Sequence, residues 1–232
     1  MLAGARSLLP PRRMLWGKTS AAAPASTDPY IQALWDSADQ PRLAEMYLAS
    51  RGLNLRPKPM PAALRGHGSI KCTETGKSSP AVLAAIRSGR DGILTGLQRV
   101  WVERSYIADR HIAPKGSRAP LEVPKKTLGR CLDGAIRLFD AAPEMGLTGG
   151  FEDALAVWLM YRIPCWAATG EGRMTRVWIP PTVKRLMLFG DNDGPGRAAL
   201  RTAADRFRNQ CRTEIALPSR GKDFCEELTS WL

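Results

Sequence analysis

The sequence predicts an α/β fold, with a small, mainly parallel sheet flanked by helices and an α+β N-terminal region before it. Two observations support this prediction. In the last third of the chain, short apolar runs alternate with helix-like segments, a pattern typical of parallel strands joined by helices. Upstream, two helix-like segments precede a β-hairpin pattern, so helices and strands follow each other there in separate groups.

Composition favours a polyanionic partner. The 232 residues are enough for one large or two small domains, and a hydrophobic content of 44% can form a core. Lys and Arg number 34 against 22 Asp and Glu, a net charge of +12. Nucleic acid is the first candidate partner and an anionic membrane surface the second, although a basic surface also serves solubility alone.

Two further classes are disfavoured by composition. No apolar run approaches the length needed to cross a bilayer, so no membrane span is expected. The five cysteines are scattered and never spaced as Cys-x-x-Cys, which argues for a reducing compartment and against a zinc ribbon.

Residues 1–29 form a basic segment rich in Ala and Ser, with no acid before Asp28. This composition resembles a mitochondrial transit peptide. A disordered basic arm, or a start codon assigned too far upstream, gives the same pattern, and these two interpretations together are favoured. We therefore exclude the segment from the predicted fold.

Residues 30–140 are expected to form the α+β region. Apolar spacing predicts a helical hairpin over residues 30–52, followed by a Pro- and Gly-rich crossing at 56–68. Strand-forming runs at 80–86 and 93–102 predict a β-hairpin, and 135–139 is a further short strand.

A basic loop is expected at residues 104–126. It contains Arg104, Arg110, Lys115, Arg118, Lys125 and Lys126 among Pro and Gly. One interpretation is a surface that contacts phosphates without reading sequence, and the other is a solvated loop. The overall charge favours contact with phosphate.

The last third supplies the alternation of strands and helices. Strands are expected at 144–147, 164–168, 186–189 and 212–217, and helices from residues 154, 197 and 221. Helices are expected on both sides of the resulting parallel sheet.

Acidic residues follow the apolar run at 186–189. Asp191 and Asp193 project to the same side if the extended conformation continues, because strand residues alternate. Two such carboxylates repel unless a cation joins them, and Mg²⁺ is the natural candidate because it prefers oxygen ligands. A surface turn is the alternative, since turns use Asp, Asn and Gly.

Acids at three places are expected to meet at one edge. Residues 152–153, 191–193 and 223 all lie at or just after the carboxyl ends of predicted strands, where α/β sheets bind ligands. Glu152 and Asp153 also suit a helix amino end, where they offset the dipole. A structural protein has little reason to gather carboxylates in this way, so the convergence favours a cation site.

These motifs resemble a known family. The segment Gly149–Asp153, the Asp191-Asn192-Asp193 run with its following glycines, and Gly221-Lys222-Asp223 are similar to the Toprim domain of bacterial primases and topoisomerases. The likeness is closer to the primase-like Toprim proteins of phages and plasmids, and weaker upstream matches extend it from about Tyr30 to Leu232. We expect a basic arm at 1–29, a primase-like region at 30–140 and a Toprim-type domain at 141–232.

The resemblance implies a set of site residues. Asp191 and Asp193 would hold Mg²⁺ and act in catalysis, with Asp153 and Asp223 contributing directly or through water. Template or triphosphate would be held by basic residues, namely Arg197, Lys222, Lys115, Arg118 and Arg99.

The resemblance also implies the reaction and the partners. It implies transfer of ribonucleotides to make RNA primers on single-stranded DNA, with a replicative helicase as a further partner. The implied location is cytoplasmic, in a bacterial, phage or plasmid context. No tyrosine nucleophile context accompanies the motifs, which argues against a complete topoisomerase.

Two departures leave catalysis open. The family has a glutamate immediately before the glycine that matches Gly150, as general acid or base, and this chain has Gly149 there. Glu152 is the nearby candidate to replace it. The zinc ribbon of many relatives also has no counterpart. The alternatives are a degenerate Toprim protein that binds DNA or a replication partner, and a Toprim nuclease.

Overall fold

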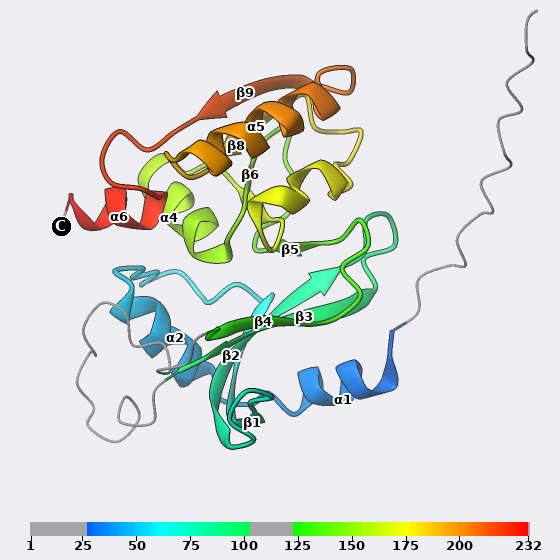
Figure 1. Ribbon diagram of the computed structural model, residues 1–232, viewed down its shortest axis with the longest axis vertical. Helices are drawn as coiled ribbons and strands as arrows, with labels where there is room; N and C mark the ends of the chain where they lie inside the picture. Colours follow the sequence, from blue (N-terminus) through cyan, green and yellow to red (C-terminus); the bar gives the residue numbers. More distant parts are fainter. Residues whose placement is uncertain (1–26, 103–122, 232) are drawn as a thin grey trace, which may run out of the picture.

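The computed structural model describes residues 27–102 and 123–231, and Figure 1 shows the arrangement of its elements. The helices are α1 (Pro29–Asp36), α2 (Pro41–Ser50), α4 (Phe151–Tyr161), the short 3₁₀ helix η1 (Glu171–Arg176), α5 (Gly194–Phe207) and α6 (Phe224–Thr229). The strands are β1 (Leu64–Lys71), β2 (Ser78–Arg87), β3 (Leu94–Trp101), β4 (Lys125–Gly129), β5 (Ala135–Arg137), β6 (Glu144–Thr148), β7 (Cys165–Ala167), β8 (Arg185–Phe189) and β9 (Arg212–Ala216).

One continuous sheet runs through the described chain. Its order is β4-β3-β2-β5-β7-β6-β8-β9, with β1 beside β2. The strands from β7 to β9 are parallel, whereas β1 to β5 pair antiparallel. The predicted fold class is confirmed, because a mainly parallel sheet with helices follows an α+β region.

Strand β5 joins the two parts of the sheet. Its Ile136 lies opposite Ile86 of β2 on one side and Ala167 of β7 on the other, antiparallel in both cases. The parallel sheet is therefore the end of a larger one, which the sequence pattern did not indicate. Figure 1 shows the parallel strands with α4, α5 and α6 in the upper half and the antiparallel strands with α1 and α2 below.

The helices cover both faces. In β2, alternate residues enter different cores: Val82, Ala84 and Ile86 pack with α2, α4 and α6, and the residues between them pack under α1. In β6 and β8, Met145, Leu147, Leu186 and Leu188 form a third core with α5 and η1. This period-two division is what a strand buried on both faces requires.

The two predicted helices and the β2–β3 hairpin are confirmed. The pairing of the two helices as a helical hairpin was wrong, because α2 and α1 pack into different cores on opposite faces of β2. Strands β1 and β4 were not predicted, because their sequences are broken by Gly or rich in Lys, and both lie at edges of the antiparallel pairing. Of the predicted basic loop, Lys125 and Lys126 lie in β4, and residues 104–122 fall outside the described part of the chain. Within 27–102 and 123–231, no helix is both long enough and apolar enough to span a membrane.

Packing between β6 and its neighbours requires a glycine at position 146. A Cβ atom there would lie 2.4 Å from the Cys165 sulfur and 2.8 Å from the Phe189 ring. We expect Gly146→Ala to lower the free energy of unfolding by about 1–3 kcal/mol, because the core must shift to admit the methyl group. Urea unfolding measures this.

Gly194→Ala is the matched control for that experiment. A Cβ atom at Gly194 meets nothing within 4 Å, so this variant should unfold within about 0.5 kcal/mol of the wild type. Equal stabilities of the two variants would contradict the packing described for β6.

Candidate active site at the carboxyl edge of the sheet

Two helices that begin at the carboxyl edge are capped by aspartates. Asp193 follows β8 and accepts a hydrogen bond from the Gly196 N–H at 2.8 Å, at the start of α5. Asp223 follows β9 and accepts from the Glu226 N–H at 2.7 Å, at the start of α6. Each cap uses one carboxylate oxygen, so the local helix starts fix both side chains at the edge.

The loops at this edge are tied together by main-chain donors. The Asn192 N–H donates to the Lys222 carbonyl at 2.8 Å, which joins the β8–α5 loop to the β9–α6 loop. The Cys225 N–H lies 3.3 Å from Asp153 Oδ1, which brings the start of α6 to the start of α4. The predicted acids therefore come from three loops that contact one another.

The carboxylates are close enough to affect one another. Ligand atoms of Asp153, Asp223 and Cys225 lie within 4.8 Å of one another. The pKa of Asp153 is raised to about 7, first by burial and then by the charges of Asp223, Glu152 and Asp191 in that order. Burial also raises the pKa of Asp191, with Lys222 acting against it.

Lys222 lies over the aspartate pair. Its Nζ atom is 3.1 Å from Asp193 Oδ2 and 3.6 Å from Asp191 Oδ2. The ammonium group offsets the repulsion between the two carboxylates, and the hydrogen bond to Asp193 raises the pKa of the lysine. The sequence singled out Lys222 as a phosphate ligand, and the structure places it where it can also act as the counter-ion of the pair.

Glu171 is a member of this site that sequence reasoning missed. Its Oε1 accepts the Asp191 N–H at 2.6 Å from the first position of η1. Burial raises its pKa, as do the charges of Asp191 and Asp193. The other acids were predicted because they follow the carboxyl ends of strands. Glu171 meets the same criterion, because it closely follows the carboxyl end of β7.

Glu152 lies differently from what we expected. It is 3% exposed, accepts a hydrogen bond from the Tyr47 hydroxyl at 2.9 Å and pairs with Lys125 Nζ at 2.8 Å. Both of its oxygens thus bind groups of the N-terminal region. The Glu152 carboxylate thus holds α4 to α2 and β4. This geometry does not support the expectation that Glu152 replaces the missing glutamate.

The predicted basic ligands are divided by the structure. Arg197 donates to the Asn192 side chain and so stays beside the aspartates. Arg99 lies in β3 with its guanidinium 5.0 Å from the Trp101 ring centroid, on the side of Tyr30 and Cys72. Lys115 and Arg118 lie outside the described residues, so their roles stay predictions.

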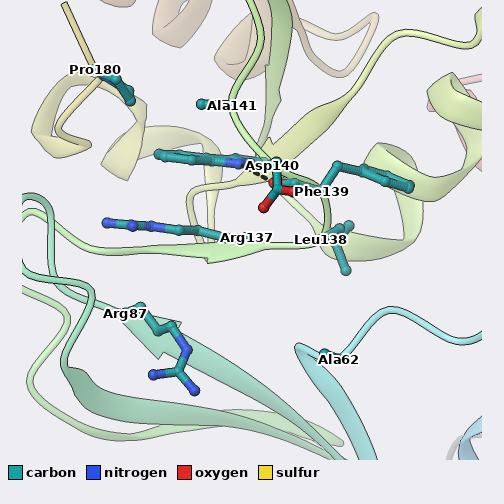
Figure 2. Close-up of a pocket in the computed structure, with 9 residues that line it drawn as sticks. Ala62, Arg87, Arg137, Leu138, Phe139, Asp140, Ala141 and Pro180 are labelled. Atoms are coloured by element: carbon teal, nitrogen blue, oxygen red, sulfur yellow. Dashed lines mark hydrogen bonds between the residues drawn. The ribbon is translucent and has the colours of Figure 1, made fainter.

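A pocket of about 560 Å³ lies where the two parts of the sheet meet. Figure 2 shows side chains that line it, among them Arg87, Arg137 and Asp140. The Arg137 guanidinium lies 4.6 Å from the Trp166 ring centroid and donates to the carbonyls of residues 88 and 89. Two arginines beside an aromatic ring provide cationic and flat apolar surface together.

Two family models match the chain. Residues 144–230 match a Toprim domain, and residues 25–138 match a domain of unknown function (DUF7146). No curated protein matches the sequence.

Three solved structures resemble this chain in fold. The DnaG catalytic core has 15% sequence identity and a TM-score of 0.51, covering 86% of this chain and 74% of that one. A DNA primase domain from Pseudomonas aeruginosa has 18% identity and a TM-score of 0.41, over 70% and 52% of the two chains. The RNA polymerase domain of Mycobacterium tuberculosis primase DnaG, in complex with double-stranded DNA, has 16% identity and a TM-score of 0.40, over 87% and 60%.

The likeness to the DnaG catalytic core, which has a TM-score of 0.51, shows a shared fold. The chain spans about half of the Pseudomonas chain and about three quarters of the DnaG core. Residues 144–230 therefore form a Toprim domain, within a chain that shares the fold of the DnaG catalytic core.

The raised pKa of Asp153 predicts a pH-dependent stability. The pKa of Asp153 is about 7 in the folded state, against the ordinary value of 3.8. Between these two pH values the folded state therefore binds more protons than the unfolded state. The free energy of unfolding thus falls as pH rises from about 4 to about 7. We expect Asp153→Asn, measured in EDTA, to raise the free energy of unfolding at pH 8, because it removes an unfavourable charge. The gain should be roughly 1–2 kcal/mol, less than the full pKa shift implies, because solvent screens the charge of a partly buried group. The gain should disappear near pH 4.

Chemical unfolding across this pH range measures the effect, and Asp205→Asn is the control. Asp205 is exposed on α5 and paired with Arg208, so its removal should give no gain at pH 8. A wild type as stable as Asp153→Asn at pH 8 would contradict the electrostatics described here.

Proposed function

We propose that this chain is a Mg²⁺-dependent nucleotidyltransferase that makes RNA primers on single-stranded DNA. The observation that carries the proposal is the convergence of Asp153, Asp191, Asp193 and Asp223 from three loops onto one edge of a primase-like fold. The single-stranded template and ribonucleotides are its proposed partners, with a replicative helicase as a further one in a cytoplasmic setting.

The donor set fits a hard divalent cation. Asp191 and Asp193 are both placed around a single cation already, the Lys222 ammonium group. The pKa values of Asp153 and Asp191 are raised in part by neighbouring carboxylates, and a bound cation would remove that repulsion. Asp191 and Asp193 would hold Mg²⁺, with Asp153 and Asp223 beside them, and the ion would supply charge stabilisation at the reacting phosphate.

The reaction transfers a nucleotide to a 3′ hydroxyl. The hydroxyl oxygen bonds to the α-phosphorus of a ribonucleoside triphosphate, the bond from that phosphorus to the bridging oxygen breaks, and pyrophosphate leaves. The hydroxyl proton passes to a carboxylate at the edge. Lys222 contacts Asp193 and Arg197 contacts Asn192 at this edge, and both would bind phosphate oxygens and orient the triphosphate.

Other cationic surface would hold the nucleic acid. The pocket with Arg87 and Arg137 offers guanidinium groups and the Trp166 ring, which suit phosphate and a base respectively. The excess of basic residues over the whole chain supports backbone contact without sequence readout.

A second candidate is a non-catalytic Toprim protein that binds DNA or a replication partner. The observation that favours it is Gly149, which stands where the family has a glutamate. Incubation of the purified protein with single-stranded template, ribonucleotides and Mg²⁺ distinguishes the two functions: short RNA products support the transferase. Degraded template without synthesis would instead indicate a nuclease.

Neutralising the aspartate pair should abolish synthesis without unfolding the protein. Asn caps helices as well as Asp does, so Asp191→Asn with Asp193→Asn should keep the start of α5 intact. We expect primer synthesis to fall at least about 10²-fold, with circular dichroism unchanged. Asp205→Asn is the control, and a double variant as active as this control would refute the assignment.

Removing Lys222 should separate ion binding from catalysis. The ammonium group competes with a divalent ion for Asp191 and Asp193, so Lys222→Met should bind Mg²⁺ more tightly than the wild type while synthesis falls. Titration calorimetry measures the affinity. Lys184→Met, an exposed lysine before β8, is the control, and a weakened affinity in Lys222→Met would contradict the competition.

A further inference from the structure

The volume beside Gly149 is filled by another residue. A Cβ atom built on Gly149 would lie 2.8 Å from Glu171 Cγ and 3.1 Å from the Glu171 main-chain nitrogen. The two segments are joined next to this contact, because the Gly170 N–H donates to the Gly149 carbonyl at 2.7 Å. A side chain at position 149 and the present side chain of Glu171 would therefore occupy the same space.

The Glu171 carboxylate lies in a cradle made by three glycines. A Cβ atom at Gly190 would lie 2.9 Å from Glu171 Oε1, and one at Gly196 would lie 3.0 Å from Oε2. Because Gly149, Gly190 and Gly196 have no side chains, they leave the space that the Glu171 side chain occupies. The half-buried carboxylate thus has a built place between the ends of β6 and β8 and the start of α5.

The position of this carboxylate connects it to the proposed ion site. Its Oε1 holds the Asp191 main chain through the 2.6 Å hydrogen bond, and the charges of Asp191 and Asp193 help to raise the pKa of Glu171. Glu152, the alternative in sequence, is bound to Tyr47 and Lys125 instead. Of Glu152 and Glu171, it is therefore Glu171 that lies beside the aspartate pair.

We propose that Glu171 performs, from the segment after β7, the role that the Toprim pattern gives to the glutamate missing at position 149. Its catalytic part rests on the function proposed above: Glu171 accepts the proton of the 3′ hydroxyl as that oxygen bonds to the α-phosphorus and pyrophosphate leaves. Its second part concerns the site alone: the negative charge of Glu171 strengthens binding of the divalent ion.

Glu171→Gln tests the charge without removing the contact. Glutamine keeps an oxygen that accepts the Asp191 N–H, so a purely structural role would leave both ion binding and synthesis unchanged. We expect Mn²⁺ affinity, measured by calorimetry, to fall about tenfold and primer synthesis to fall about 10²- to 10⁴-fold, with an unfolding midpoint no lower than that of the wild type. Glu144→Gln, at the opposite end of β6, is the control and should match the wild type.

Moving the carboxylate tests the shared volume. Gly149→Glu alone should lower the unfolding midpoint and the activity, because two side chains compete for one place. The double variant Gly149→Glu with Glu171→Ala should have a higher unfolding midpoint and a higher activity than either single variant. If the protein were simply degenerate at position 149, Gly149→Glu alone would gain activity, and that result would overturn the proposal.

The two proposals fail in different ways. A wild type that makes no primers would refute the proposed function, and Mn²⁺ binding would then decide the place of Glu171 in the site. A tenfold weaker affinity in Glu171→Gln supports that place, and an unchanged affinity overturns it. Unchanged synthesis in Glu171→Gln, in an active wild type, overturns the catalytic part.

Discussion

Repulsion among carboxylates at one edge of the sheet is the constraint on which the site depends. The charges of Asp191 and Asp223 help to raise the pKa of Asp153, and Glu171 adds a further acid beside Asp191. Without opposing interactions, the like charges of these carboxylates would push their side chains apart. Helix caps, main-chain donors and the Lys222 ammonium group hold it together. In the proposed function, a divalent cation bound at this edge would relieve the repulsion.

The N-terminal region supports the same edge from the other side. Strand β5 continues the sheet from β2 to β7, so the two regions share main-chain hydrogen bonds. Glu152 adds a buried connection, because it binds Tyr47 of α2 and Lys125 of β4 from the first turn of α4. The start of α4, which carries Asp153, is thereby held in place by the antiparallel part of the chain. Glu152 stabilises the site, although its carboxylate does not face the aspartate pair.

The sequence predicted the parallel strands and the three aspartate loops because each strand is a short apolar run followed by an acid. It missed β1 and β4, whose glycines and lysines carry little apolar signal and whose pairing depends on β2 and β3. It also missed the continuity through β5, since three residues cannot indicate two partners. The assignment of Glu152 followed nearness in sequence. Glu171 is 22 positions from Gly149, and only the fold brings their main chains into contact.

Anomalous diffraction from a crystal grown with Mn²⁺ shows whether the carboxylates at this edge share a divalent ion. We expect a peak about 2.1–2.3 Å from carboxylate oxygens of Asp191 or Asp193, with Asp153 and Asp223 beside it and the Lys222 ammonium group moved away. A saturated crystal with no peak at this edge, and with Lys222 still between the two aspartates, would contradict this expectation.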